Sequence, residues 1–361
     1  MRVGIISMQR VANYGSFLQA YGLRRLLEER GCEVVFIDYR SGKPVVPYSR
    51  LRALLYDIKR MIPFEPVTDR IQYSILGRRP FWIEYRLKYL PLLGVGSRYR
   101  YHEDVDAVVI GSDEVFNCLQ NNKRVGFTPM LFGQDLGGAR VISYAASFGY
   151  TTPEGLEKAG VKETVAGWLK SFQALSVRDR NSFETIRSLT GITPQQHLDP
   201  VLMADFDLPE VSLPFDRYCL LYTYGNRPYT QEEKQAILTF CGNNGLELVS
   251  IGDVQSWVPH TMTADPFEML ACFSKASFVI TDTFHGTVFS NKLNCNFVTR
   301  IRPDNRQKLG DLLEKLGQTG RLIENYDHLQ EYYDDPPSFN ETNRIIAGER
   351  ERTRAYLREN L

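Results

Sequence analysis

Short runs of β-branched and other apolar residues alternate with longer stretches of helical period, and this alternation occurs twice along the chain. Such a pattern is typical of βαβ units around a parallel sheet. In the first half the predicted strands are residues 2–7, 33–37, 105–110, 140–145 and 174–177, and the predicted helices are 17–30, 164–169 and 181–189. The first half is therefore expected to form a Rossmann-like domain.

The second half shows the same alternation of predicted strands and helices. Its predicted strands are residues 218–223, 246–251, 277–281 and 296–299, and its predicted helices are 231–241, 266–275 and 306–316. A chain of 361 residues exceeds the usual size of a domain with a single hydrophobic core. Prolines at residues 205–214 interrupt any periodic element, so the linker between two domains is expected there. We therefore expect an α/β fold with Rossmann-like domains at 1–205 and 206–335, and a charged C-terminal helix, 336–361, that packs back on the first domain.

One stretch breaks this rhythm. Residues 41–102 are rich in Arg, Pro and Tyr, and helices are predicted near 51–61 and 81–89. We interpret the stretch as an insertion over the edge or the mouth of the first sheet.

Charge and cysteine usage exclude several classes of function. The 43 basic residues balance the 43 acidic ones, so no net field attracts a nucleic acid or holds the chain on an anionic membrane. The six cysteines are dispersed without metal-ligand spacing, which fits free thiols in a reducing cytoplasm and predicts no metal site. The N-terminal apolar run of about six residues is shorter than a signal peptide or a membrane span requires.

Ligands of doubly wound sheets bind beyond the carboxyl ends of the strands, so the loops that follow predicted strands come first. After the first strand, Asn13 and Tyr14 precede Gly15, which permits close backbone approach. The N–H groups of the helix that starts there could receive an anion or a sugar hydroxyl. The alternative is that Asn13 and Ser16 merely cap the helix.

A second loop follows residues 108–110. Gly111 and Ser112 lead into two adjacent carboxylates, Asp113 and Glu114. Carboxylates at a strand tip can bind sugar hydroxyls or serve as a base. The alternative is an aspartate cap beside a solvated glutamate.

The third loop, residues 281–287, is the most informative. It places His285 at a predicted junction between strand and helix, with Asp282, Thr283 and Gly286 around it. Imidazole is the side chain best matched to proton transfer near neutral pH. We therefore expect His285 to act at a reacting centre, although a lone histidine is more often structural.

Six segments in order resemble the polysaccharide pyruvyl transferase family: residues 13–15, 111–113, 143–149, 176–179, 198–201 and 281–287. The resemblance implies a GT-B-like pair of Rossmann domains facing a central cleft, with phosphoenolpyruvate bound in the cleft. Members of this family pyruvylate the sugars of capsules, exopolysaccharides and cell-wall polymers.

The same resemblance assigns residues. His285 corresponds to the catalytic histidine of the family, and Arg178 to its arginine for the phosphate or carboxylate of phosphoenolpyruvate. Glu114 stands where relatives often carry Gln, and Thr283 where some branches carry a second arginine. The second anion anchor is therefore expected after the next predicted strand, where a solvated basic surface is the alternative; the candidates are Arg300, Arg302, Arg306 and Lys308.

The implied reaction joins the enolpyruvyl unit of phosphoenolpyruvate to two hydroxyls of a sugar, in a polysaccharide or a lipid-linked glycan precursor, and releases phosphate. His285 would donate a proton to the methylene carbon or assist the departure of phosphate, and Asp113 or Asp282 would accept one from the sugar. No cofactor is expected beyond the donor substrate. The alternatives are a GT-B glycosyltransferase that uses a nucleotide sugar and a non-catalytic relative that binds sugar or phosphate. The sequence identifies neither the acceptor nor the oligomeric state.

Overall fold

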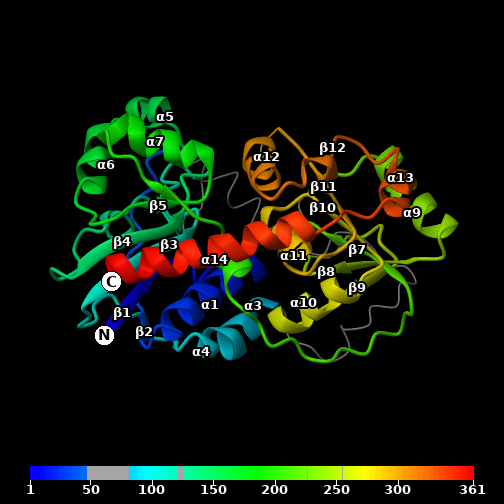
Figure 1. The fold of residues 1–361 in the computed structure, drawn as a ribbon, viewed down its shortest axis with the longest axis horizontal. Coiled ribbons are helices and arrows are strands. Elements are labelled where there is room, and N and C mark those ends of the chain that lie inside the picture. Colours follow the sequence, from blue (N-terminus) through cyan, green and yellow to red (C-terminus); the bar gives the residue numbers. More distant parts are fainter. Residues whose placement is uncertain (47–80, 121–124, 226, 254, 304) are drawn as a thin grey trace.

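The computed structural model describes residues 1–46, 81–120, 125–225, 227–253, 255–303 and 305–361. These residues form two six-stranded sheets, each with helices packed around it (Figure 1). Every strand pairing is parallel. The expected α/β architecture with two Rossmann-like sheets is confirmed.

The first sheet has the order β2-β1-β3-β4-β5-β6. Its strands are β1 (Arg2–Ile6), β2 (Glu33–Phe36), β3 (Ala107–Asp113), β4 (Arg140–Ala146), β5 (Ser176–Val177) and β6 (Gln195–Gln196). The accompanying helices are α1 (Tyr14–Glu28), α3 (Phe81–Glu84), the π-helical turn η1 (Tyr85–Tyr89), α4 (Leu90–Leu92), the 3-10 turn η2 (Pro129–Phe132), α5 (Pro153–Lys158), α6 (Lys162–Leu169), α7 (Arg180–Thr190) and α8 (Pro200–Met203).

The second sheet has the order β12-β11-β10-β7-β8-β9. Its strands are β7 (Tyr218–Tyr222), β8 (Glu247–Ile251), β9 (His260–Met262), β10 (Phe278–Thr281), β11 (Phe297–Arg300) and β12 (Leu322–Ile323). The helices that follow are α9 (Gln231–Asn243), α10 (Pro266–Lys275), α11 (Phe284–Lys292), α12 (Arg306–Lys315), the 3-10 turn η3 (Thr319–Arg321), α13 (Leu329–Asp334) and α14 (Asn340–Asn360).

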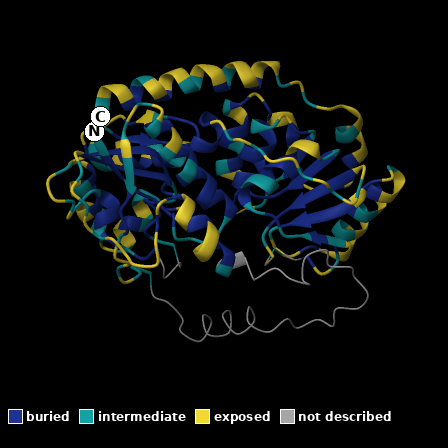
Figure 2. Cartoon of the chain, turned by 90° about the horizontal axis from the view of Figure 1, so that it is seen from below, coloured by how far each residue is buried: buried dark blue, intermediate teal, exposed yellow. Residues whose placement is uncertain are grey.

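The central strands are apolar because helices cover both faces of each sheet. All five residues of β7 are buried, as are all four of β10, and Figure 2 shows the strands in dark blue. Strands buried on both faces read as continuous hydrophobic runs rather than alternating ones. This explains why the strand positions could be predicted from short apolar runs.

Capping side chains fix where the helices of the second domain begin. The Thr230 side chain accepts a hydrogen bond from the Glu233 N–H at the start of α9, while the Glu233 side chain accepts one from the Thr230 N–H. Asp265 and Glu268 form the same reciprocal pair at the start of α10. Each pair satisfies backbone donors that lack a partner within the helix.

The short helix α8 lies just before the linker predicted at residues 205–214, and the sequence did not predict it. The Asp199 side chain accepts a hydrogen bond from the Val201 N–H, and Pro200 occupies the first turn. Both features favour a helix start. The helix packs against α1, α11 and α14, so its first residue lies between the two domains.

The described part of the insertion covers α1. The ring of Tyr85 in η1 lies 6.3 Å from that of Phe17, and its hydroxyl donates to the carbonyl of Gln9 at 2.8 Å. The helix predicted over residues 81–89 is present as α3 and η1. The one predicted near 51–61 lies outside the described residues.

The long helix α14 crosses both domains (Figure 1). Near its start, the Thr342 hydroxyl donates to the carbonyl of Leu316 in the second domain at 2.9 Å. Near its end, the Tyr356 hydroxyl donates to the carbonyl of Ser143 in β4 at 2.7 Å. The C-terminal helix therefore packs back on the first domain, as the sequence predicts.

His197 lies beneath α14 and makes the stability of the fold depend on pH. Its Nδ1 is 2.8 Å from the Ser176 hydroxyl, and its ring lies 4.8 Å from that of Tyr356. Burial, with the Arg352 charge, lowers the pKa of His197 from 6.5 to about 4. Between these values the unfolded chain binds more protons than the folded one, so the free energy of unfolding falls as the pH drops through this window.

We therefore expect His197 to contribute up to about 3 kcal/mol to the pH dependence of stability below pH 6.5. Urea unfolding of the wild-type chain and of His197→Gln from pH 7 to pH 4.5 measures this difference. The variant should lose less stability on acidification. His328→Gln is the matched control, because His328 is exposed and pairs with its neighbour Glu331. Equal slopes for wild type and His197→Gln would contradict the prediction.

Candidate active site

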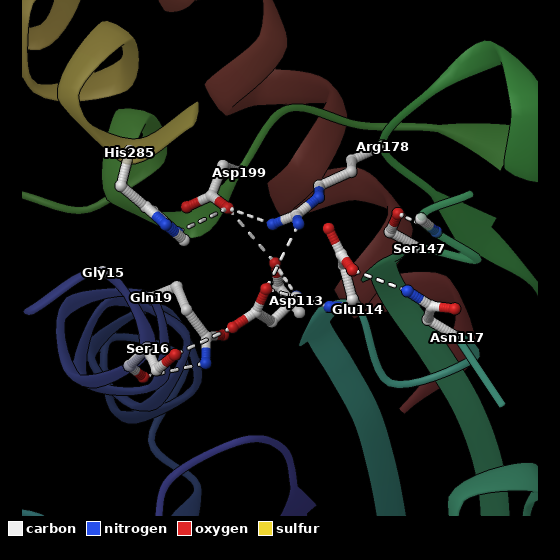
Figure 3. Close-up of polar contacts among 12 residues, drawn as sticks. Gly15, Ser16, Gln19, Asp113, Glu114, Asn117, Ser147, Arg178, Asp199 and His285 are labelled. Carbon is white, nitrogen blue, oxygen red and sulfur yellow. Dashed lines mark hydrogen bonds and ion pairs between the residues drawn. The ribbon is translucent and has the colours of Figure 1, made fainter. Parts of the chain in front are cut away.

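Three of the loops identified from the sequence meet between the two sheets. The loop after β1 leads into α1, the loop after β3 carries Asp113 and Glu114, and the loop after β10 leads into α11. Strands β1 and β3 are paired neighbours, so their carboxyl ends lie side by side. Figure 3 shows the side chains from these loops pointing toward one another.

His285 stands in the first turn of α11 and faces the first domain. Thr283 caps this helix, since its hydroxyl accepts a hydrogen bond from the Gly286 N–H at 2.9 Å. The imidazole lies directly against the backbone of Gly15: a Cβ at Gly15 would be 2.2 Å from its Cγ. Gly15 therefore serves close packing against His285. Gly286 is equally constrained, because a Cβ there would be 2.1 Å from the Thr281 hydroxyl.

Arg178 is held between two carboxylates beside His285 (Figure 3). Its Nη1 lies 3.0 Å from Asp199 Oδ2, its Nη2 lies 3.2 Å from Asp113 Oδ1, and its side chain is only 4% exposed. The ring of Phe284 packs 4.3 Å from its guanidinium carbon. The two carboxylates fix the guanidinium plane, and this buried ion triad forms the centre of the site.

Asp199 lies in the segment 198–201 that resembles the family, but the sequence alone predicts no role for it. Its Oδ2 lies 3.8 Å from His285 Nε2 and also accepts a hydrogen bond from the Ser112 hydroxyl at 3.3 Å. Its side chain has no exposed area. Asp199 thus joins Arg178, Ser112 and His285, and the proline that follows it is the local signal that fixes its position at a helix start.

Asp113 is ionised in this setting. Burial raises its pKa, but the charge of Arg178, together with hydrogen bonds from the Glu114 N–H and the Ser16 hydroxyl, holds the pKa below its usual value. The Ser16 hydroxyl donates at 3.0 Å. An ionised carboxylate that also contacts Arg178 can accept a proton from a substrate hydroxyl.

His285 is neutral in the free protein. Burial is the largest influence and lowers its pKa, and the charges of Arg178 and Lys308 lower it further. The carboxylates of Asp199 and Asp113 raise the pKa, but it stays below its usual value. Nε2 finds no hydrogen-bond partner among the described residues. A buried nitrogen without a partner is costly, so a bound molecule that supplies a partner would stabilise the site.

Glu114 closes one side of the site through an ion pair between the domains. Its Oε1 lies 3.3 Å from Lys308 Nζ of α12, and its Oε2 accepts a hydrogen bond from Asn117 at 2.7 Å. Lys308 is 35% exposed. Lys308 is one of the four cations proposed from the sequence as the second anion anchor, and its charge lowers the pKa of His285.

Asn13 and Tyr14 play structural parts at the same junction. Asn13 Oδ1 accepts hydrogen bonds from the N–H groups of Gly15 and Ser16, so the start of α1 is capped by its own side chain. The Tyr14 hydroxyl donates to the carbonyl of Ala264 in the second domain at 2.5 Å. The capping alternative for this loop is therefore the one that the contacts favour.

Asp282 belongs to a second group of contacts. Its Oδ2 lies 2.9 Å from Arg302 Nε and 3.6 Å from Arg227 Nε, and its Oδ1 accepts a hydrogen bond from the Thr223 hydroxyl at 2.7 Å. Arg300 Nη2 lies 2.8 Å from Glu233 Oε1. We call Arg227, Arg300 and Arg302, with Asp282 and Glu233, the arginine cluster.

Tyr224 stands between the two groups. Burial raises its pKa to about 12, the carboxylates of Asp113 and Asp282 add to this shift, and a hydrogen bond with Asn13 opposes it. The guanidinium carbon of Arg227 lies 5.9 Å from the Tyr224 ring, so Tyr224 contacts both Asn13 and the arginine cluster.

Within the described ranges, no group of three or more His, Cys, Asp or Glu side chains is positioned to hold a metal ion. The described helices also include none that is long and apolar enough to cross a membrane.

No curated protein is significantly similar to this chain. Among solved structures, MnaA of S. aureus with UDP is 11% identical, with 99% of this chain and 96% of that chain covered and a TM-score of 0.49. The UDP-GlcNAc 2-epimerase of Methanocaldococcus jannaschii is also 11% identical, with coverages of 99% and 100% and a TM-score of 0.49. A kitacinnamycin glycotransferase is 13% identical, with coverages of 100% and 99% and a TM-score of 0.48.

The sequence comparison with protein families is decisive. The family model for polysaccharide pyruvyl transferases matches residues 13–304. This range begins at the loop after β1 and includes Arg178, Asp199 and His285. The chain belongs to the polysaccharide pyruvyl transferase family.

Proposed function

We propose that this protein transfers the enolpyruvyl unit of phosphoenolpyruvate to two hydroxyls of one sugar, forming a cyclic pyruvate ketal and releasing phosphate. The observation that carries the proposal is the buried His285, whose Nε2 lacks a hydrogen-bond partner among the described residues beside the Arg178 ion triad. Family membership supports the same reaction.

The donor is assigned to Arg178 and Lys308. Both cations lower the pKa of His285, so both act within electrostatic reach of its ring. A guanidinium fork suits a carboxylate or a phosphate, and a lysine supplies a point charge. Arg300 and Arg302 lie in the arginine cluster, where they contact Glu233 and Asp282.

Donor binding would change the protonation of His285. A phosphoenolpyruvate anion beside the imidazole raises its pKa, since a nearby negative charge favours the charged form. The protonated His285 then gives its proton to the methylene carbon, which leaves a cationic centre at C2. One sugar hydroxyl attacks C2 and passes its proton to Asp113, which is ionised and faces the same site.

The second half of the reaction closes the ketal. The bond between C2 and the phosphate oxygen breaks, and phosphate leaves with the proton that Asp113 had accepted. The second hydroxyl attacks C2 and returns its proton to His285. The proton of the first hydroxyl leaves on phosphate, and the proton of the second hydroxyl replaces the one that His285 gave to the new methyl group. Asp113 therefore ends ionised and His285 ends protonated, as each was when the reaction began. Asp113 is the base of this scheme rather than Asp282, because Asp113 contacts Arg178 of the donor site, whereas Asp282 contacts Arg302 of the arginine cluster.

The site of action is proposed to be the cytoplasm. All six cysteines are free, and five of them are buried. Free thiols persist in a reducing compartment.

The proposal is tested by incubating the purified protein with phosphoenolpyruvate and a panel of galactosides, glucosides and mannosaminides, free and lipid-linked. We expect phosphate release that depends on the acceptor, and a product with the mass of the acceptor plus pyruvate minus water. Consumption of a nucleotide sugar in place of phosphoenolpyruvate would identify a glycosyltransferase. Binding of phosphoenolpyruvate without turnover of any acceptor would identify a non-catalytic relative.

A further inference from the structure

The backbone that carries Arg178 is held from both domains. Within the first domain, the Arg178 N–H donates to the carbonyl of Ala146 at the end of β4, at 3.1 Å. From the second domain, Lys315 Nζ of α12 donates to the carbonyl of Arg178 at 3.0 Å. Two residues further along, the Arg180 N–H donates to Asp311 Oδ2 of α12 at 2.9 Å. Two of these three backbone hydrogen bonds therefore come from the opposite domain.

The side chains that make these contacts are removed from water. Asp311 is buried, with a side chain only 9% exposed, and Lys315 is half-buried. Burial is the largest influence on the pKa of Lys315 and lowers it. A charged group away from water is costly unless hydrogen bonds compensate it. The carbonyl and the N–H of the segment 178–180 supply such hydrogen bonds, one to each side chain.

Helix α12 lies at the side of the second domain that faces α7 of the first domain (Figure 1). Lys308, Asp311 and Lys315 are spaced by three and four residues, which places them in one row along a helix. The row is about 10 Å long. Lys308 at one end pairs with Glu114 at 3.3 Å, and Lys315 at the other end reaches Arg178. One face of α12 therefore holds the loops after β3 and β5 of the first domain.

The start of α12 is tied to the loop that carries the reacting histidine. Asn305 directly precedes the helix and is buried. Its Nδ2 donates to the carbonyl of Asp282 at 2.8 Å, and Asp282 stands three residues before His285. Helix α12 thus connects the loop of His285 in its own domain with the backbone of Arg178 in the other.

We propose that α12 is the element through which the second domain positions Arg178, with Lys315 and Asp311 as the positioning residues. The inference rests on the proposed function, in which Arg178 binds phosphoenolpyruvate. A helix fixed at its start to the loop of His285 and along its face to the backbone of Arg178 sets the distance between the imidazole and the guanidinium. Loss of the contacts to Arg178 and Arg180 should weaken the binding of phosphoenolpyruvate and leave His285 in place.

The test measures phosphoenolpyruvate binding and steady-state kinetics for Lys315→Met and Asp311→Ala. Each variant removes a hydrogen bond between a charged group and the backbone of the segment 178–180. We expect the Kd and the KM of phosphoenolpyruvate to rise by about 10-fold or more, while kcat and the KM of the acceptor stay close to the wild-type values. A merely structural role would lower the active fraction, which reduces kcat and leaves the KM unchanged.

Conservative variants and a control on the same helix complete the design. Lys315→Arg keeps a charged N–H donor and Asp311→Asn keeps an acceptor oxygen, so both should retain most of the affinity for phosphoenolpyruvate. Glu314→Gln is the matched control. Glu314 pairs with the Arg180 side chain at 2.8 Å, but both side chains are 61% exposed, and exposed ion pairs contribute little. Its kinetics should equal those of the wild-type protein.

Hydrogen exchange without substrate separates this inference from the proposed function. Amides in the peptide 176–181 should exchange faster in Lys315→Met and Asp311→Ala than in the wild-type protein and Glu314→Gln, because the segment loses contacts that fix it. Unchanged exchange, an unchanged Kd in a folded variant, or a loss confined to kcat would each overturn the inference. Failure of the proposed function would appear differently: the wild-type protein would not bind phosphoenolpyruvate, while the exchange difference between the variants would persist.

Discussion

Replacement of His285 by Asn is expected to lower acceptor-dependent phosphate release by about 100- to 10,000-fold while the chain stays folded. The imidazole is the group that transfers protons in the proposed reaction, and Asn cannot be protonated at neutral pH. Asn keeps a planar polar side chain of smaller volume beside Gly15, so the packing between α1 and α11 should survive. Steady-state phosphate release and thermal unfolding of the same preparation measure the two effects. A variant with the full rate would show that His285 is not the reacting group.

Two further measurements sharpen this prediction. His328→Asn should keep the wild-type rate, because His328 is exposed and distant in sequence from the matched loops. In the wild-type protein, burial holds the pKa of His285 below its usual value until the donor binds. His285 must be protonated for the reaction, so the rate falls as the pH rises above its pKa. The profile of kcat/KM for phosphoenolpyruvate reports the pKa in the free protein, and that of kcat reports the pKa in the substrate complex. As the pH rises, kcat/KM should therefore begin to fall at a lower pH than kcat does. Coincident profiles would contradict the proposed coupling of donor binding to proton uptake.

A methyl group added at Gly15 should also abolish most of the activity. In Gly15→Ala the new Cβ would stand 2.2 Å from both Cγ and Nδ1 of His285, so the imidazole must move away from the first domain. A displacement of about 1 Å in a reacting group can cost about 100-fold in rate, and we expect at least that loss. The helix itself should tolerate the change, since Ala favours a helix over Gly by about 1 kcal/mol.

The control for this variant is Gly348→Ala in α14. A Cβ there meets nothing within 4 Å, so the same substitution should leave the rate unchanged and raise the free energy of unfolding by about 1 kcal/mol. Combining Gly15→Ala with His285→Asn gives a second check. If the glycine acts only by leaving room for the imidazole, the double variant should be no slower than His285→Asn alone. A further large loss in the double variant would contradict this role.

Most of the fold could be predicted from local sequence. Continuous apolar runs identify strands that are buried on both faces, and α10 spans the predicted residues 266–275 because Pro266 and the Asp265 cap define its start. The short strands β6, β9 and β12 were not predicted. They are two or three residues long, too short for a periodic pattern, and pairing with a neighbour is what makes them strands.

The loops that form the candidate site could be predicted from the sequence, but the ion pairs between their side chains could not. The position after a strand indicates that Asp113 and His285 lie at carboxyl edges, but no local signal says that Asp199 joins Arg178 to His285. Asp282, three residues before His285, instead holds Arg302 and Arg227. Ion pairs between residues distant in sequence depend on tertiary packing, which a single sequence does not reveal.

The long reach of α14 has a consequence for how the chain acquires its structure during translation. Tyr356 binds the carbonyl of Ser143, 213 positions earlier, and Thr353 contacts Tyr144. The first domain must therefore leave the ribosome with the α14-binding surface of β4 uncovered and wait until the entire second domain has been synthesised. Contacts of such long sequence separation form late and slowly, and apolar surface exposed meanwhile favours aggregation. The nascent first half is expected to be the stage at which this protein most needs a chaperone.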